Sequence, residues 1–257
     1  MAAKKKSTES VELSLTKLDF QAIELAIVGV TPFICNAMSA KVRQDLLMPP
    51  KKKNKTERET TLKHDPLAEF RRSPYYTKSE DDPTLIICPA GAVKNAIASA
   101  ALDVPGAKKT EIGRLSWIVG RDLPLYGLPE IFCSVVRNSD MARTPDVRTR
   151  AILPEWAMTF TIQYVVPNLT HTAIANLLEA AGLVCGLGDW RQQKGKGNYG
   201  QFRVTTLDDP ELRRIMKVGG HAAQSTAMEA PIPHDNETRE LLDWYESEAN
   251  RRGLRAS

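Results

Sequence analysis

Apolar and polar residues alternate along two segments of the chain, and this alternation predicts two β-strands. In residues 18–29 the apolar side chains fall at mostly alternate positions, and Thr31-Pro32 ends the run. In residues 157–165 the alternation is stricter, because threonine and glutamine residues separate the apolar and aromatic ones. The second segment is therefore the clearest strand of the sequence.

Apolar residues spaced three and four positions apart predict two helices. The first covers about residues 90–103, and Lys94 projects from its first turn, away from the apolar face. The second follows Thr170 or Thr172, either of which can cap it. A further strand is predicted after the second helix, near residues 201–206.

The predicted elements follow the order strand, helix, two or more strands, helix, strand. This βαββαβ order is typical of an α+β, ferredoxin-like or RRM-like domain, in which helices lie on one face of an antiparallel sheet. Basic and polar stretches are expected outside that core. The expected organisation is a basic arm at 1–17, a domain at 18–206 with a basic insertion at 49–82 and an Arg-rich hairpin at 137–155, and an acidic, helical C-terminal extension at 207–257.

The composition is that of a globular protein rather than a membrane protein. Of the 257 residues, 42% are hydrophobic and 26% are charged, which is ordinary for a globular domain. No apolar run approaches the roughly 18–20 residues that span a bilayer, and the basic N-terminus lacks the apolar stretch of a signal peptide. The cysteines are far apart and mostly lie among apolar neighbours, which predicts buried free thiols and a cytoplasmic protein.

The charge is unevenly distributed, although the formal net charge is only +4. Lysines and arginines outnumber acids in residues 41–80, and residues 191–203 carry cations without any acid. From residue 207 onward the balance reverses. Such a distribution attracts a polyanion to one region, or brings the acidic end of one copy against the basic face of the next.

The segment from Gly186 to Gly200 combines glycines, cations and aromatic rings between the second helix and the last strand. Glycine lets another backbone approach closely, cations attract phosphate, and flat rings stack on bases. This combination suits a single-stranded nucleic acid better than a small metabolite, although a flexible basic loop has a similar composition. The candidate binding residues in this segment are Trp190, Arg191, Lys194, Gly195, Lys196, Gly197 and Tyr199.

Several short motifs follow one another along the predicted domain. They are Gly29-Val30-Thr31-Pro32, Ile87-Cys88-Pro89-Ala90-Gly91-Ala92-Val93-Lys94, Arg148-Thr149-Arg150-Ala151-Ile152-Leu153-Pro154-Glu155-Trp156, and Gly186-Leu187-Gly188-Asp189-Trp190-Arg191 with Gly195-Lys196-Gly197 and Phe202. In this order they resemble the RAMP proteins of CRISPR systems, over roughly residues 18–206. The resemblance is greatest to the repeated backbone subunit of multi-subunit effector complexes, and the glycine-rich segment is its only sharp motif.

The resemblance implies a function, a set of partners and several site residues. Such backbone subunits bind guide RNA without sequence preference and polymerise along it as a helical filament. The implied partners are therefore single-stranded RNA, further copies of this chain and other subunits of an effector complex, with no cofactor and no membrane. The implied phosphate contacts come from Lys94 at the first helix and from the basic residues of the glycine-rich segment, while Gly195 and Gly197 allow close approach. The implied thumb-like hairpin would carry Arg143, Arg148 and Arg150.

Two other functions are open from the sequence. Some relatives of this kind cleave target RNA through an aspartate after the first strand, and Asp65 or Asp82 could serve in a metal-dependent ribonuclease. A phage-borne or stand-alone relative could instead bind or anneal single-stranded DNA. No His/Cys cluster has metal-ligand spacing, and neither a P-loop nor a Gly-x-Ser-x-Gly motif is present. We therefore expect a binding protein rather than an enzyme.

Overall fold

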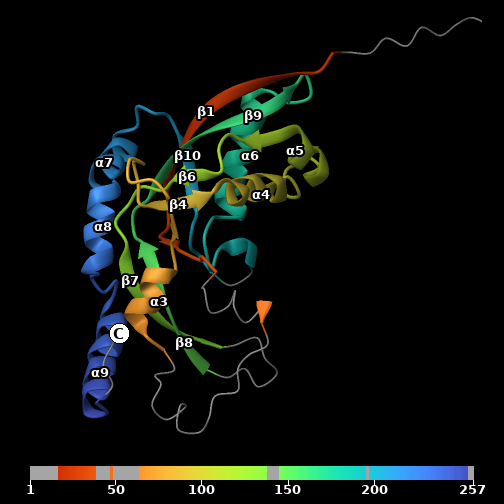
Figure 1. Ribbon diagram of the computed structural model, residues 1–257. Coiled ribbons are helices and arrows are strands. Elements are labelled where there is room, and N and C mark those ends of the chain that lie inside the picture. Colours follow the sequence, from red (N-terminus) through yellow and green to blue (C-terminus); the bar gives the residue numbers. More distant parts are fainter. Residues whose placement is uncertain (1–16, 39–46, 49–63, 138–144, 195–196, 254–257) are drawn as a thin grey trace, which may run out of the picture.

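The computed structural model describes residues 17–38, 47–48, 64–137, 145–194 and 197–253, and every structural statement below concerns these residues. The molecule is a mixed α/β structure with antiparallel sheets. A four-stranded sheet with its helices occupies one end, and a long hairpin flanked by helices occupies the other (Figure 1).

The central sheet contains four strands, each antiparallel to its neighbours. In order across the sheet they are β10 (Phe202–Thr205), β1 (Asp19–Gly29), β9 (Ala157–Val166) and β5 (Ser116–Ile118). β1 and β9 pair over almost their whole length, whereas β10 pairs only with the last residues of β1. The strands predicted at 18–29, 157–165 and 201–206 are therefore confirmed, and the sheet joins segments that lie far apart in the sequence.

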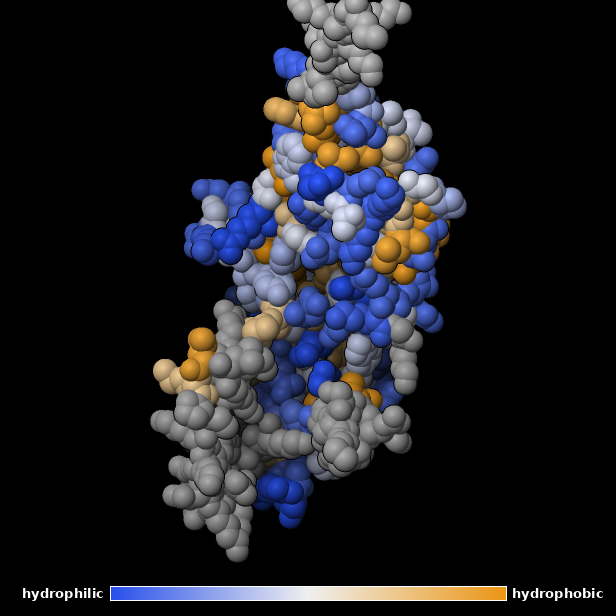
Figure 2. Space-filling model, turned by 90° about the vertical axis from the view of Figure 1, so that its right-hand side faces the viewer, coloured by the Kyte–Doolittle hydropathy of each residue, from blue (hydrophilic) through white to orange (hydrophobic). Residues whose placement is uncertain are grey.

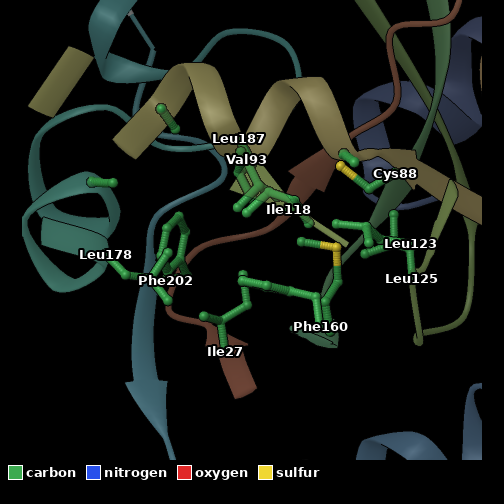
Figure 3. Packing of buried hydrophobic residues seen from close by; sticks show 14 of the residues in the cluster. Ile27, Cys88, Val93, Ile118, Leu123, Leu125, Phe160, Leu178, Leu187 and Phe202 are labelled. Carbon is green, nitrogen blue, oxygen red and sulfur yellow. The ribbon is translucent and has the colours of Figure 1, made fainter. Parts of the chain in front are cut away.

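Two helices pack against each other on one face of this sheet. They are α4 (Ala90–Ala100) and α6 (His171–Val184), and the short α5 (Lys109–Leu115) follows α4. Thr170 is the residue that caps α6, because its side-chain oxygen accepts a hydrogen bond from the Ala173 amide at 3.1 Å. Figure 3 shows Val93 of α4 and Phe202 of β10 in the same apolar cluster as Ile27 of β1. Both predicted helices are confirmed, and their apolar faces close the main core.

A further helix covers part of the opposite face of the sheet. α7 (Pro210–Val218) packs Leu212 and Ile215 against Ala26 and Val28 of β1. The expectation of helices on one face only is therefore correct for α4 and α6 but not for the sheet as a whole. Successive residues of β1 point to opposite faces, so both faces of this strand segment are buried.

The long hairpin differs from the one expected at 137–155. Its strands are β7 (Glu130–Arg137) and β8 (Pro145–Leu153), and the short β2 (Phe33–Ile34) pairs with the end of β8. The range 137–155 thus contains the second strand and only the last residue of the first strand, because the first strand begins at Glu130. The apolar residues of β7 bury one face of the hairpin, and this pairing is not visible in the local pattern of charges.

Two helices from opposite ends of the chain cover the hairpin. They are α3 (Pro66–Arg72) and α9 (Asn236–Arg251). Phe70 of α3 is fully buried, and the Ser73 hydroxyl accepts a hydrogen bond from the Ala151 amide of β8 at 2.7 Å. The second part of the expected insertion at 49–82 therefore contributes to the core, contrary to its polar composition, while residues 49–63 lie outside the described part.

A small three-stranded sheet supports the start of α4. Its strands are β3 (Tyr75–Tyr76), β4 (Ile86–Pro89) and β6 (Asp122–Pro124), and β4 runs directly into α4. Gln224 of α8 (His221–Glu229) is fully buried beside this sheet. Its side chain accepts from the Ile86 amide at 2.9 Å and donates to the carbonyls of Leu125 and Gly127 at 2.8 and 2.9 Å. The C-terminal extension is thus bound to the fold by specific polar contacts.

The surface is largely polar on the face shown in Figure 2, where hydrophobic residues form small separate patches. Within the described ranges, none of the helices combines the length and the apolar character that crossing a membrane requires.

Candidate nucleic-acid interface

The glycine-rich segment is a compact loop that is hydrogen-bonded to the chain after β1. The Leu187 amide donates to the Gly200 carbonyl at 2.9 Å, which closes the loop at its base. The Gly200 amide donates to the Pro32 carbonyl at 2.8 Å, and the Asp189 amide donates to the Ile34 carbonyl at 2.9 Å. These contacts fix the loop beside residues 31–38, which connect β1 to the hairpin end of the molecule.

Two glycines of this loop are required by its own packing. Gly200 has a φ of 72°, and a Cβ there would lie 1.7 Å from the carbonyl oxygen of Leu187. A Cβ at Gly197 would lie 1.4 Å from the carbonyl oxygen of Trp190. The space beside Gly197 is therefore filled by the loop itself. The close approach implied by the resemblance is, at this position, an approach of backbone to backbone.

The two aromatic rings of the loop are anchored on the hairpin. Trp190 and Tyr199 lie 5.9 and 6.3 Å from the ring of Phe132 on β7, and 6.0 Å from each other. Ile34 and Ile152 complete this cluster beneath them. Both rings remain half-buried, so each keeps part of its surface exposed while its orientation is held by neighbouring rings.

The loop and the segment after β1 enclose an open hollow of about 1340 Å³, including the solvent at its mouth. The Arg191 guanidinium is held at its wall by a hydrogen bond to the Gly188 carbonyl at 3.1 Å. Lys194, at the end of the 3₁₀ turn Gln192–Lys194, is exposed. The glycine-loop hollow, as we call it, is lined by Thr31, Pro32, Asn36, Gly188, Asp189, Trp190, Arg191, Lys194, Gly197, Asn198 and Tyr199.

The hairpin arginines lie next to this hollow. Arg148 and Arg150 alternate along β8 and share a crevice with Asp189 and Trp190, which also line the hollow. The Arg150 Nε lies 3.9 Å from an Asp189 carboxylate oxygen and has no hydrogen-bond partner among the described residues, while Nη1 of the same guanidinium donates to the Thr149 carbonyl at 3.3 Å. Part of the charge of Arg150 is thus balanced by Asp189.

The start of α4 and the glycine-rich loop both lie near residues 36–37. Asn36 lines the glycine-loop hollow, and the next residue, Ala37, lines a neighbouring groove together with Pro89, the residue that precedes α4. Lys94 itself is half-buried one turn further along and lines neither depression. The start of α4 therefore lies near the hollow, whereas Lys94, the predicted phosphate contact, is not among the residues that line it.

Arg203, the last basic residue of the 191–203 stretch, is not among the residues that line the hollow and instead contacts the C-terminal extension. Arg203 of β10 pairs with Asp209 at 2.9 Å and with Glu211 at 2.7 Å. Its hydrogen bond to Asp209 lowers the pKa of that carboxyl well below its usual range. Within the described part of the chain, no residue after 206 lines the hollow, so the acidic extension leaves it open.

Asp65 and Asp82, the two candidate catalytic aspartates, each accept a hydrogen bond from a nearby residue of the chain. Asp65 caps α3 by accepting a hydrogen bond from the Ala68 amide at 3.0 Å. Asp82 accepts a hydrogen bond from the Thr77 hydroxyl in an exposed turn. The adjacent His64 instead contacts Glu69 at 2.7 Å and Asp146 at 2.8 Å. Among the described residues, the structure finds no group of three His, Cys, Asp or Glu side chains arranged to hold a metal ion.

The predicted site residues thus divide into several groups. Trp190, Arg191, Lys194, Gly197 and Tyr199 meet in one hollow, with Arg148 and Arg150 beside it, and Arg143, Gly195 and Lys196 lie outside the described residues. Thr31, Pro32 and Asn36 also line the hollow but were not predicted as site residues, since small residues after a strand carry no local signal for binding. Comparison with known proteins adds no assignment, because no family model and no curated protein matches this sequence.

Proposed function

We propose that this protein binds single-stranded RNA without sequence preference, in the manner of the backbone subunit of CRISPR effector complexes. The observation that carries the proposal is the glycine-loop hollow, where cations and half-exposed rings line one open depression. Phosphate groups would contact Arg191 and Lys194, and bases would stack on Trp190 and Tyr199. Such contacts recognise features that every nucleotide shares, so the binding would be sequence-independent.

The topology supports the same proposal. We propose a ferredoxin-like core, and two observations support it: β1, α4, β5, β9, α6 and β10 follow one another in βαββαβ order, and the order across the sheet is β10-β1-β9-β5. In a RAMP protein the glycine-rich loop follows the second helix of such a domain, as the present loop follows α6. We further propose that the β7–β8 hairpin is the thumb-like element that reaches a neighbouring copy on the same RNA strand.

The proposal is tested by measuring fluorescence anisotropy of labelled oligouridylate with the wild-type chain and with the variant Arg191→Ala/Lys194→Ala. Losing two charge-assisted contacts should weaken binding at least about tenfold at moderate salt. The matched control is Lys217→Ala/Arg239→Ala, which removes two exposed cations of α7 and α9 and should leave the affinity unchanged. Equal affinity of the wild type and the hollow variant would refute the assignment.

The same assay separates RNA from DNA and binding from cleavage. A matched deoxyoligonucleotide should compete more weakly than the RNA, because only RNA offers a 2′-hydroxyl to the polar groups of the hollow. Equal competition would favour a single-stranded DNA-binding protein. RNA recovered intact after incubation with Mg²⁺ is the expected result, and cleavage that is lost in Asp65→Ala or Asp82→Ala would favour the ribonuclease.

A further inference from the structure

A second basic and aromatic depression lies beside the glycine-loop hollow. It is an open groove of about 1550 Å³, including the solvent at its mouth, between the end of α3, β3 and the turn before β6. Four cations, including Arg72, Lys78 and Arg121, line it against a single carboxylate, Asp122. We call it the tyrosine groove, because Tyr75 and Tyr76 of β3 also line it and are 39% and 38% exposed.

The wall of the tyrosine groove is held rigidly. Arg71 donates hydrogen bonds to the carbonyls of Met228 and Glu229 at the end of α8, so this cation is occupied by the fold. Tyr76 donates its hydroxyl to the Arg71 carbonyl. Tyr75 is fixed by strand pairing with Ile87. Both rings therefore project from a strand whose backbone is already paired before a ligand binds, which lowers the entropic cost of binding.

The remaining cations of the groove are available to a ligand. Arg72, Lys78 and Arg121 are exposed, and no contact of their side chains with a carboxylate occurs among the residues that the structure describes. Exposed cations that pair with no carboxylate in the described part of the chain favour a polyanion, and exposed rings between them favour bases over the carboxylates of an acidic peptide. The groove thus combines the two contacts that a single-stranded nucleic acid requires.

The two depressions are adjacent along one short segment of the chain. Asn36 lines the glycine-loop hollow, and Ala37 and Met38 line the tyrosine groove. We propose that an RNA strand leaving the glycine-loop hollow continues past this segment into the tyrosine groove, where a base stacks on Tyr75 and phosphates contact Arg72 and Arg121. This inference rests on the proposed function of the hollow and adds a second site to it.

The test compares labelled oligouridylates of about 5 and about 15 nucleotides, because only the longer one can occupy both depressions. The variants Tyr75→Ala and Arg72→Ala/Arg121→Ala should each bind the longer RNA about tenfold more weakly. Their affinity for the shorter RNA should equal that of the wild type. Tyr75→Phe retains the ring and should bind both lengths normally, which separates stacking from a general loss of structure.

Different failures have different meanings. If the wild-type chain binds neither RNA, the proposed function and the tyrosine groove both fail. If it binds both RNAs but the groove variants bind the longer one normally, only the tyrosine groove is refuted. Displacement of the longer RNA by polyglutamate as effectively as by unlabelled RNA would also refute it, in favour of an acidic peptide.

A measurement on the wild-type chain keeps the test valid if a variant does not fold. A photoreactive 4-thiouridine placed at successive positions of the longer RNA should crosslink to the peptide that contains Tyr75. Crosslinks confined to the peptide that contains Trp190 would overturn the inference.

Discussion

Replacing Gln224 by leucine should destabilise the protein substantially, because this side chain satisfies three buried backbone groups. The variant leaves the Ile86 amide without its acceptor and removes the donor to the carbonyls of Leu125 and Gly127. An unsatisfied buried donor costs about 1–3 kcal/mol, and each lost hydrogen bond to a carbonyl about 0.5–1.5 kcal/mol. The apolar leucine recovers part of this, so the free energy of unfolding should fall by about 2–4 kcal/mol.

Chemical denaturation measures this change directly, and thermal unfolding should show a melting temperature lower by roughly 5–15 °C. The control is Thr226→Ala on the same helix, since Thr226 is exposed and its hydroxyl donates to the Ala222 carbonyl of its own helix. That variant should change the free energy of unfolding by less than about 0.5 kcal/mol. A Gln224→Leu variant as stable as the control would show that α8 is not docked through these three bonds.

Two further predictions concern packing and the thiols. In Gly91→Ala the added Cβ meets nothing within 4 Å, so this variant should be as stable as the wild type or slightly more stable. In Gly182→Ala the added Cβ would lie 2.0 Å from the Phe202 carbonyl oxygen. Chemical denaturation should therefore show a large loss of stability for Gly182→Ala, although alanine is a better helix former than glycine. Equal stability of these two variants would contradict the packing of α6 on β10. Burial raises the pKa of all four cysteine thiols, to about 12 for Cys88. The native protein should therefore resist alkylation by iodoacetamide until it is unfolded. The free energy of unfolding should also decrease as the pH rises above about 9, because the thiols ionise at a lower pH in the unfolded chain than in the folded one. Rapid alkylation of native protein would contradict this burial.

The principal elements of the central sheet were predictable from the sequence because their signals are local. The alternation in 157–165 and the spacing of apolar residues in α4 and α6 record which side of each element is buried. Thr170 was one of two candidate caps, and the geometry of the first helical turn decided between them. The buried cysteines were likewise predictable from their apolar neighbours.

Other elements depend on contacts that no local pattern records. The segment containing Phe70 is polar and basic, yet it is buried because α3 packs against β8, which lies about 80 positions further along the chain. The extent of the hairpin was mispredicted for a similar reason. The pairing of β7 with β8 follows from their shared buried face rather than from the arginines that suggested a hairpin.

The sequence by itself determined that the segment after α6 carries glycines, cations and rings. Only the tertiary structure decided how these residues are arranged, because their positions depend on neighbours that are remote in the sequence. Trp190 and Tyr199 are oriented by Phe132, and the loop closes a hollow only where it meets residues 31–38. Residue type sets the chemistry that a side chain can offer. Long-range packing determines which side chains face the same space and which make contacts within the protein instead.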